Sequence, residues 1–595
     1  MLKQDFDLDW QYCEAFGMMA RSGQWQPVNL PHDAMISRPR AASNPSGSSG
    51  GFFPGSVASY RKKFFVPEDW RGQSVQLEFE GVYMNAEVTV NRQLLSLQPY
   101  GYTSFVVDIT PYLAFEQENE VEVSANTTAQ PNSRWYSGTG IYRHVWLRRG
   151  GSIHIQPWGV FITTPFVDPA VSVVQVATDL TSLSGPNERA ILRTTILDME
   201  GRTLALAEIP LRSFSVQQTL LVKNARLWSV DEPNLYTLWS EVLSGGLVVD
   251  REETIFGIRT VQMDARNGFR LNGVPLKLKG GCIHHDHGPL GAASYDRAEE
   301  RKVEILKGAG FNALRSSHNP PAPALLDACD RLGLLVIDET FDCWRLGKSP
   351  NDYHLYFEEW WQRDTAALVR RDRNHPSVII WSIGNEVPES RGVPGGASLC
   401  QRQVDFVRSL DSTRFVTSAI QPYIGAGMAR GDFSLHFNPP PVPEDPQNDI
   451  WANLTTHFAE PLDIVGYNYM PHRYSVDGIR YPGRIIAGTE TWLHTAYNSW
   501  KETERLPYVI GDFIWTAWDY LGESGLGRAA IDGKATFAAR YPYHLANVGD
   551  FDICGFKRPQ SYYRDLLWGV RTEPFIGVLD PQLAGKTLGF TPWGW

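Results

Sequence analysis

The chain has 595 residues, of which 43% are hydrophobic and 20% charged, with a net charge of −11 and a pI near 5.7. A single hydrophobic core rarely supports a chain of this length, so several domains are expected. The acidic balance argues against a nucleic-acid partner, because no basic face is available to neutralise phosphates.

Six cysteines lie along the chain without C-x-x-C spacing, which predicts reduced thiols rather than a disulfide framework. The first residues, MLKQDFDLDW, carry acids where a signal peptide needs a basic patch and an apolar run. No window of about 18 apolar residues is present, so no membrane span or membrane partner is predicted. These features predict a soluble, cytoplasmic protein. They are compatible with a homo-oligomer but do not set the oligomeric state.

The first 259 residues read as short strands with alternating hydrophobicity, separated by turn signals. Residues 1–151 predict a jelly-roll β-sandwich, in which 74–82, 86–95 and 119–127 are the clearest strands and Asn91-Arg92 is a tight turn. Residues 152–259 carry further short strands, about the seven that an immunoglobulin-like β-sandwich needs.

The pattern changes near Arg259, where apolar runs begin to alternate with helical stretches. This alternation is typical of βαβ units, and eight such strands in about 300 residues predict a (β/α)8 barrel over residues 260–575, followed by a C-terminal tail, 576–595. The eight predicted strands are 276–285, 311–318, 334–340, 378–386, 415–420, 463–469, 485–492 and 509–520.

The connection from Gln421 to Leu462 is too long for an ordinary βα loop and contains FNPPPVPEDP. We expect an ordered active-site lid there rather than a regular element.

Polar residues gather at the carboxyl ends of the predicted barrel strands, which is where barrel enzymes carry out catalysis. Two of them are the carboxylates Glu386, after the fourth strand, and Glu490, in the seventh. Glycoside hydrolysis with retention needs two carboxyl groups roughly 5–5.5 Å apart, one as proton donor and one as nucleophile. The other polar residues at these ends include His284, His285, Asp286, Arg315, His318, Asp338, Glu339, Asn385, Tyr469, Trp492 and Trp515.

The motifs WSIGNEVPE (381–389) and GTETW (488–492) resemble those of glycoside hydrolase family 2, the β-galactosidase and β-glucuronidase family. RSSHNPP (315–321) and SRWYSGTGIYRHVWL (133–147) strengthen the resemblance, which covers nearly the whole chain. It implies that Glu386 is the general acid/base, that Glu490 is the nucleophile and that no cofactor is needed. It also implies that Asn385 holds the 2-hydroxyl and that Tyr469 bonds the nucleophile, while His284, Arg315, His318 and Trp515 line the pocket.

Three departures from the family pattern bear on the substrate. An aspartate that reaches the sugar hydroxyls in related enzymes is replaced by the stretch Ser133-Arg134-Trp135, so Arg134 is a candidate substrate contact. The Asn-x-Lys pair by which glucuronidases hold a carboxylate is not evident; the stretch reads DFDICGFKRP, where Asp552 would repel a uronate. The magnesium site of bacterial β-galactosidases is not expected either, because Cys343 and Arg345 stand at its ligand positions.

The leading hypothesis is a retaining exo-β-glycosidase that acts on a carbohydrate substrate, with β-galactosides first and β-glucuronides or β-galacturonides as the alternative within the family. A second class is a carbohydrate-binding protein on an inactive barrel. A third is a metal-dependent hydrolase, suggested by the sequence His285-Asp286-His287. That class needs further histidines after the fifth and sixth strands, so we favour sugar contacts for the cluster and expect no metal.

Overall fold

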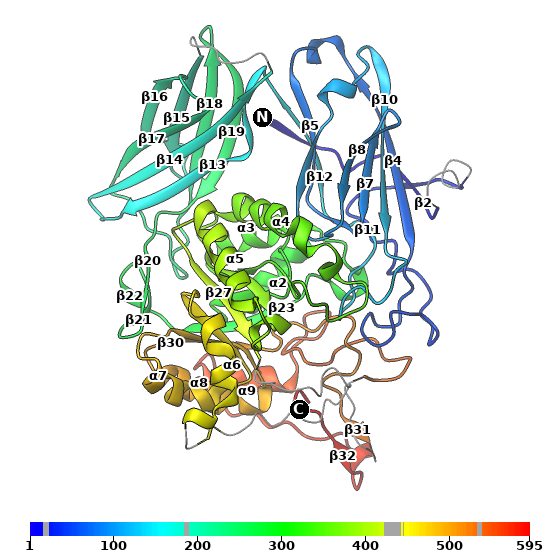
Figure 1. Ribbon diagram of the computed structural model, residues 1–595, viewed down its shortest axis with the longest axis vertical. Helices are drawn as coiled ribbons and strands as arrows, with labels where there is room; N and C mark the ends of the chain where they lie inside the picture. The colour runs from blue at the N-terminus through cyan, green and yellow to red at the C-terminus, as the bar shows by residue number, and fades with distance from the viewer. Residues whose placement is uncertain are drawn as a thin grey trace.

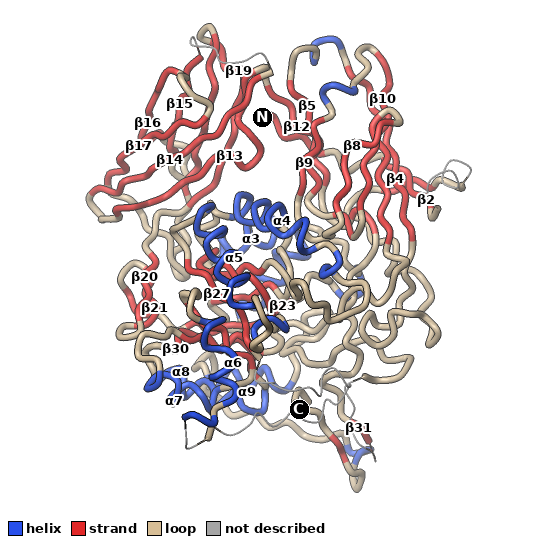
Figure 2. Tube along the Cα trace, viewed as in Figure 1, coloured by secondary structure: helices blue, strands red, loops and turns tan. Residues whose placement is uncertain are grey.

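The computed structural model describes residues 1–15, 23–183, 190–421, 442–443, 446–531, 533 and 538–594. Two β-sandwiches lie at one end of the molecule and a barrel surrounded by helices lies at the other (Figure 1). Coloured by secondary structure, the sandwiches contain almost only strands, and the long helices gather around the barrel (Figure 2). Among the described residues no helix is long and apolar enough to cross a membrane.

The N-terminal sandwich packs two antiparallel sheets around a core of alternating strand residues. As predicted, Asn91 and Arg92 form a tight turn; both have positive φ, which suits a two-residue hairpin. One sheet has the order β1 (Leu2–Asp5), β12 (Val145–Gly150), β5 (Ser74–Phe79) and β9 (Phe105–Asp108). The other has the order β3 (Gln26–Val28), β2 (Trp10–Cys13), β4 (Val57–Val66), β10 (Gln117–Asn126), β7 (Ala86–Val90) and β8 (Gln93–Gln98), while β6 (Val82–Tyr83) pairs with β11 (Gly140–Ile141).

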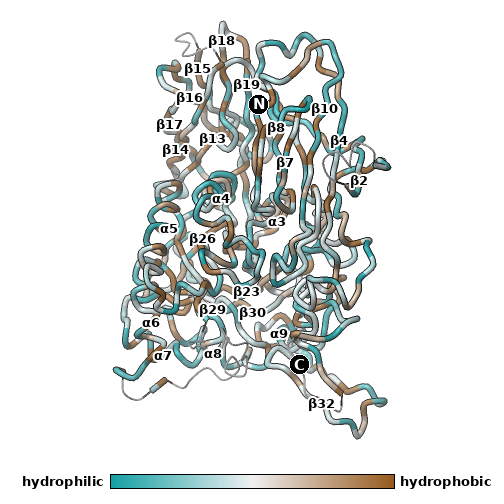
Figure 3. Tube along the Cα trace, turned by 45° about the vertical axis from the view of Figure 1, so that its right-hand side comes forward, coloured by the Kyte–Doolittle hydropathy of each residue, from teal (hydrophilic) through white to brown (hydrophobic). Residues whose placement is uncertain are grey.

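The second sandwich is immunoglobulin-like and has its own core. Teal and brown segments alternate along the sandwich strands in Figure 3, as expected when one face of each sheet is buried. Its sheets are β13 (Ile153–Phe166), β14 (Val171–Ser182) and β17 (Ser215–Lys223), and β16 (Thr203–Pro210), β15 (Ala190–Leu197), β18 (Tyr236–Ser244) and β19 (Leu247–Phe256). A small sheet of β20 (Val261–Asp264), β21 (Gly268–Leu271) and β22 (Val274–Pro275) precedes the barrel.

The barrel closes with eight parallel strands in chain order, each within one of the ranges that the sequence predicts. They are β23 (Leu278–Ile283), β24 (Ala313–Ser316), β25 (Leu335–Glu339), β26 (Val378–Asn385), β27 (Phe415–Ile420), β28 (Ile464–Asn468), β29 (Ile486–Thr491) and β30 (Val509–Ile514). Nearly every residue of these strands is buried, which explains why they read as apolar runs instead of alternating ones. The boundaries between domains at residues 151, 259 and 575 stay predictions.

Helices cover the outside of the barrel: α2 (Asp296–Gly308), α3 (Pro323–Leu332), α4 (Phe357–Asp372), α5 (Gly396–Leu410), α6 (Ile450–Ala459), α7 (Tyr474–Arg480), α8 (Ala496–Arg505) and α9 (Pro559–Leu567). The residue types at the ends of these helices explain where the helices begin and end. In α3, Pro323 occupies the first turn, where a missing N–H costs nothing, and Gly333 ends the helix with a φ of 75°.

The predicted lid between Gln421 and Leu462 lies largely outside the described residues, which omit 422–441 and 444–445. The described end of this connection is regular, not irregular as predicted, because it contains a 3-10 helix, Pro446–Asn448, and α6. Asp449 caps α6 by accepting the N–H of Ala452. The tail folds back on the barrel loops, where β32 (Leu588–Gly589) pairs with β31 (Ala530–Ile531).

Candidate active site

Asn468, the last residue of β28, lies between the two candidate catalytic carboxyls. Its main chain pairs with Glu490 in β29, and its Nδ2 donates to Oε1 of Glu386 at 2.9 Å. Glu386 directly follows β26 and has a φ of 46°, a left-handed conformation that is uncommon outside glycine and often marks functional sites. The carboxyls of strands four and seven therefore meet at one mouth of the barrel.

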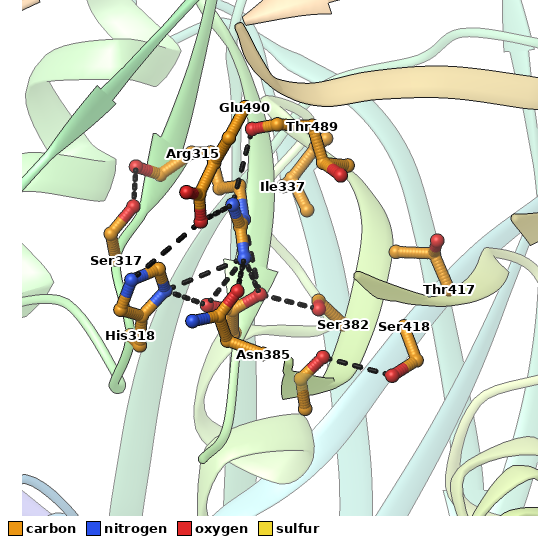
Figure 4. Close-up of polar contacts among 12 residues, drawn as sticks. Arg315, Ser317, His318, Ile337, Ser382, Asn385, Thr417, Ser418, Thr489 and Glu490 are labelled. Atoms are coloured by element: carbon orange, nitrogen blue, oxygen red, sulfur yellow. Dashed lines mark hydrogen bonds and ion pairs between the residues drawn. The ribbon is translucent and has the colours of Figure 1, made fainter. Parts of the chain in front are cut away.

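Both carboxylate oxygens of Glu490 accept a hydrogen bond. Nη1 of Arg315 donates to Oε1 at 2.9 Å, as Figure 4 shows, and the hydroxyl of Tyr469 donates to Oε2 at 2.6 Å. Gly488 precedes this residue in the same strand, where a Cβ would lie 2.3 Å from the hydroxyl of Tyr474. Because only glycine fits there, β29 can run close to α7 and hold Glu490 in place.

Arg315 joins four of the barrel strands through its fully buried guanidinium. It donates to Glu339 with both Nε and Nη2 at 2.8 to 3.1 Å, and Nη2 also donates to Oδ1 of Asn385 at 2.9 Å. Glu339 further accepts the hydroxyl of Ser382 at 2.6 Å. The oxygens of Glu339 thus bond Arg315, His318 and Ser382, which indicates a structural role for this residue.

The surroundings of Glu490 act on its pKa in both directions. Burial and then the charge of Glu386 raise the pKa of Glu490 to about 8, although Arg315 and Tyr469 act in the opposite direction. The donors to both oxygens of Glu490 favour its ionised form, which is the form that a nucleophile needs.

Two neutral histidines and several aromatic rings form the wall beside the carboxyls. His318 stacks on Trp515 with ring centroids 5.1 Å apart, and His284 lies 4.9 Å from Trp135. Burial lowers the pKa of both histidines well below the usual value, and nearby cations add to this shift. Neither ring nitrogen of His284 has a hydrogen-bond partner among the described residues, and both nitrogens are buried.

A cluster of charges lies next to this wall, and sequence reasoning found only one of its members. Arg134 donates to both oxygens of Asp342 at 2.8 and 3.0 Å and to Glu523 at 2.9 Å. Lys348 also bonds Asp342, at 2.8 Å. Although burial acts in the opposite direction, Arg134 and Lys348 hold the pKa of Asp342 well below its usual range. Nδ2 of Asn385 donates to the same carboxylate at 3.0 Å.

Three of the predicted site residues make other contacts. His285 lies between Tyr102 and Tyr142, with Nε2 3.3 Å from the carbonyl of Ser137. Asp286 accepts main-chain N–H groups, and Asp552 does the same in an exposed turn. The predicted residues that the structure does bring together are Glu386, Glu490, Asn385, His284, Arg315, His318, Tyr469, Trp492, Trp515 and Arg134.

The C-terminal tail contributes a residue that the sequence did not suggest. Nε1 of Trp593 donates to the hydroxyl of Tyr469 at 3.1 Å, and its ring packs edge-on against Tyr469 and Trp492. Tyr469 itself stacks on Trp492 at 4.8 Å. These three rings form an aromatic wall next to the oxygen of Glu490 that Tyr469 bonds.

The described residues contain one group with metal-like spacing, Asp327, Asp330 and His375, and it lies away from the catalytic carboxyls. Nδ1 of His375 is 2.6 Å from Oδ2 of Asp330, so the two side chains already satisfy each other. His285, Asp286 and His287 do not converge on a common point in this way. The active site thus offers carboxyls, hydrogen-bond donors and aromatic faces.

Comparisons with known proteins agree along most of the chain. Family models match in three segments: the glycosyl hydrolase 2 galactose-binding domain-like model at 51–148, the glycosyl hydrolases family 2 model at 153–259, and the family 2 TIM barrel domain at 262–429. The beta-galactosidase BoGH2A of Bacteroides ovatus is 39% identical over 95% of this chain and 72% of its own length. A beta-glucuronidase of Bacteroides fragilis is 25% identical over 78% of this chain and 70% of its own.

A crystal structure of a glycosyl hydrolase family 2 member from Bacteroides cellulosilyticus matches with a TM-score of 0.86 and 40% identity. The match covers 96% of this chain and 71% of that one. The chain spans about half the length of some other curated relatives, 54% and 46% in two cases.

Proposed function

The chain belongs to glycoside hydrolase family 2 and is a glycoside hydrolase; we propose that it is a retaining exo-β-glycosidase that releases terminal β-linked galactose. The observation that carries this proposal is an asymmetry between two neighbouring carboxyls: both oxygens of Glu490 accept hydrogen bonds, whereas the described residues give Glu386 a donor on Oε1 alone. That asymmetry suits a nucleophile and a proton donor respectively.

In the first step Glu490 attacks the anomeric carbon while Glu386 gives its proton to the departing oxygen, so the glycosidic bond breaks as a glycosyl–enzyme ester forms. In the second step Glu386 takes a proton from water, which attacks the same carbon and releases Glu490. Arg315 and Tyr469 orient the nucleophile in both steps. This chemistry requires no metal or other cofactor.

The charges around the pocket favour a neutral sugar over a uronate. Three cations face five carboxyls there, and Arg134, the cation suggested by sequence, is already paired with two of those acids. A substrate carboxylate would meet an excess of negative charge, whereas the oxocarbenium-like transition state gains from it. The three cations are Arg134, Arg315 and Lys348, and the five acids are Glu339, Asp342, Glu386, Glu490 and Glu523.

Exo action follows from the position of the N-terminal sandwich. Trp135, which leaves that sandwich between β10 and β11, packs against His284 and His318 at 4.9 and 5.6 Å. It therefore closes one side of the site, and Trp593 from the tail covers another. A site closed in this way accepts the end of a sugar chain more readily than its middle.

The experiment is a panel of p-nitrophenyl glycosides that compares β-galactoside, β-glucoside, β-glucuronide, β-galacturonide, β-mannoside and α-L-arabinopyranoside. Wild type should cleave the β-galactoside, and Glu490→Gln should lose nearly all turnover because the amide cannot attack. Retained stereochemistry of the first product, followed by NMR, checks the two-step mechanism. Cleavage of the uronides instead would overturn the sugar assignment, and full activity of Glu490→Gln would overturn the mechanism.

A further inference from the structure

A cleft of about 640 Å³ separates the immunoglobulin-like sandwich from the barrel. One wall is the outer face of the β13–β14–β17 sheet, which lies above the barrel helices in Figure 1. The other wall comprises the segments that precede β26 and β27, at 373–376 and 412–414, and the segment that leads into the barrel, 256–262. These are the amino ends of the barrel strands, whereas Glu386 and Glu490 lie at the carboxyl ends. The cleft is therefore separate from the active site.

Three arginines line the barrel side of this cleft, and the described residues supply one carboxylate partner among them. Arg259 donates only to the carbonyls of Pro376 and Val378, at 2.6 and 2.7 Å. Arg373 donates only to main-chain carbonyls too, at 3.2 and 3.3 Å, and its Nε is buried without a partner. Arg414 pairs with Asp411 at 2.8 Å. Neither Arg259 nor Arg373 therefore has a direct ion pair among the described residues, although Asp411 lies near enough to act on the charge of both.

Burying these two charges without a direct ion pair is costly for the protein. Burial and the charge of Arg414 lower the pKa of Arg259 to about 9, and burial and the charge of Arg370 lower the pKa of Arg373 to about 10. A buried cation is normally paired, because the interior solvates it poorly. An anion in the cleft would relieve this cost, and its hydrogen bonds to guanidinium groups would be charge-assisted.

The opposite wall offers neutral hydrogen-bonding groups in ordered rows. Thr163, Gln175 and Thr219 are cross-strand neighbours on the sheet, and Gln217 lies in the next row beside Ala177. The side chains of Gln175, Gln217 and Thr219 are exposed toward the cleft, while their neighbours along each strand are buried in the sandwich. Amides and hydroxyls at this spacing suit hydrogen bonds to the hydroxyl groups of a saccharide. A simple inorganic anion has no hydroxyl groups that could make such bonds.

We propose that this cleft binds an acidic saccharide, with its carboxylate or sulfate on Arg259 and Arg373 and its hydroxyls on the amides of β14 and β17. The protein as a whole carries a net charge of −11, so it has no general attraction for such polymers. Binding must come from local contacts in the cleft, and it should weaken at high salt because the recognition is ionic.

The test is isothermal titration calorimetry of the full chain with three probes: tetragalacturonate, the neutral β-1,4-galactotetraose and sodium sulfate. Tetragalacturonate should bind at least tenfold more tightly than the neutral tetrasaccharide or sulfate. Sulfate binding without tetragalacturonate binding would overturn the saccharide assignment in favour of a simple anion site. Absence of binding by both anions would overturn the site itself.

Two variants separate the cleft from the active site. Arg373→Gln should weaken tetragalacturonate binding at least tenfold, and Gln217→Glu, which adds a carboxylate at an exposed position, should abolish it. Thr203→Glu makes the same change in charge on the other sheet and is the matched control. Aryl glycoside turnover should be unchanged in all three. If Gln217→Glu binds as wild type does, the ligand occupies another place and the proposal fails.

Discussion

Removing the hydroxyl of Tyr469 tests the roles that we propose for Glu386 and Glu490. In Tyr469→Phe the ring stays on Trp492, while Oε2 of Glu490 loses a donor at 2.6 Å. A hydrogen bond to a buried charged group contributes about 1.5–3 kcal/mol. Because the bond favours the ionised form, its loss should raise the pKa of the nucleophile by about 1–2 units.

The assay is kcat/KM for an aryl β-galactoside as a function of pH. The nucleophile must be deprotonated, so its higher pKa should move the acid limb of the pH profile to higher pH by about 1–2 pH units. At the pH optimum kcat/KM should fall roughly tenfold or more. The basic limb of the profile is set by the general acid, a group other than the one that Tyr469 bonds, so it should stay where it is in wild type.

Tyr467→Phe is a matched control, because its buried hydroxyl donates at 2.8 Å to Asp477, outside the site. It should lower thermal stability and leave both limbs where they are. An acid limb that does not move in Tyr469→Phe, or a basic limb that moves instead, would refute the assignment of Glu490 as the nucleophile.

Three further changes test neighbouring contacts. Glu386→Ala should impair substrates with poor leaving groups far more than activated aryl glycosides, and azide should rescue it; equal losses on both would contradict its role as the acid. Glu523→Gln keeps the contact with Tyr520 but removes one of the two carboxylates paired with Arg134, so kcat/KM for a β-glucuronide relative to a β-galactoside should rise about tenfold; an unchanged ratio would count against the charge argument. Trp593→Phe removes the indole donor to Tyr469, worth about 1 kcal/mol, and should lower kcat/KM about fivefold with unchanged thermal stability.

The barrel was predictable because two features of the sequence mark each of its strands. Buried parallel strands such as β26 and β28 are apolar along their length, and each ends in a polar residue where it reaches the mouth. The sandwiches were harder to trace. β13 runs from Ile153 to Phe166, but register shifts after Ile155 and Thr163 break its alternation, so period-two reasoning did not mark it as one strand.

The contacts of Arg134 with Asp342 and Glu523 could not be predicted, for a different reason. Arg134 meets Asp342 and Glu523 across 208 and 389 residues of sequence, and the packing of the sandwich on the barrel sets both contacts. Neither acid follows a strand directly, so the rule about strand ends does not select them. Trp593 contacts Tyr469 only because the tail folds back over the barrel.

The same contacts explain why strand-end residues divide into two groups. Arg315 and Glu490 use their polar atoms on each other, whereas the nitrogens of His284 stay without partners. Asp286, only two residues further along, is bonded by the N–H groups of Gly288 and Leu521, and Lys302 adds a nearby positive charge. An open hydrogen-bonding group beside a fixed catalytic pair can respond to a ligand, while a satisfied one can only support the fold. We therefore expect a sugar hydroxyl to bind at His284 rather than at Asp286.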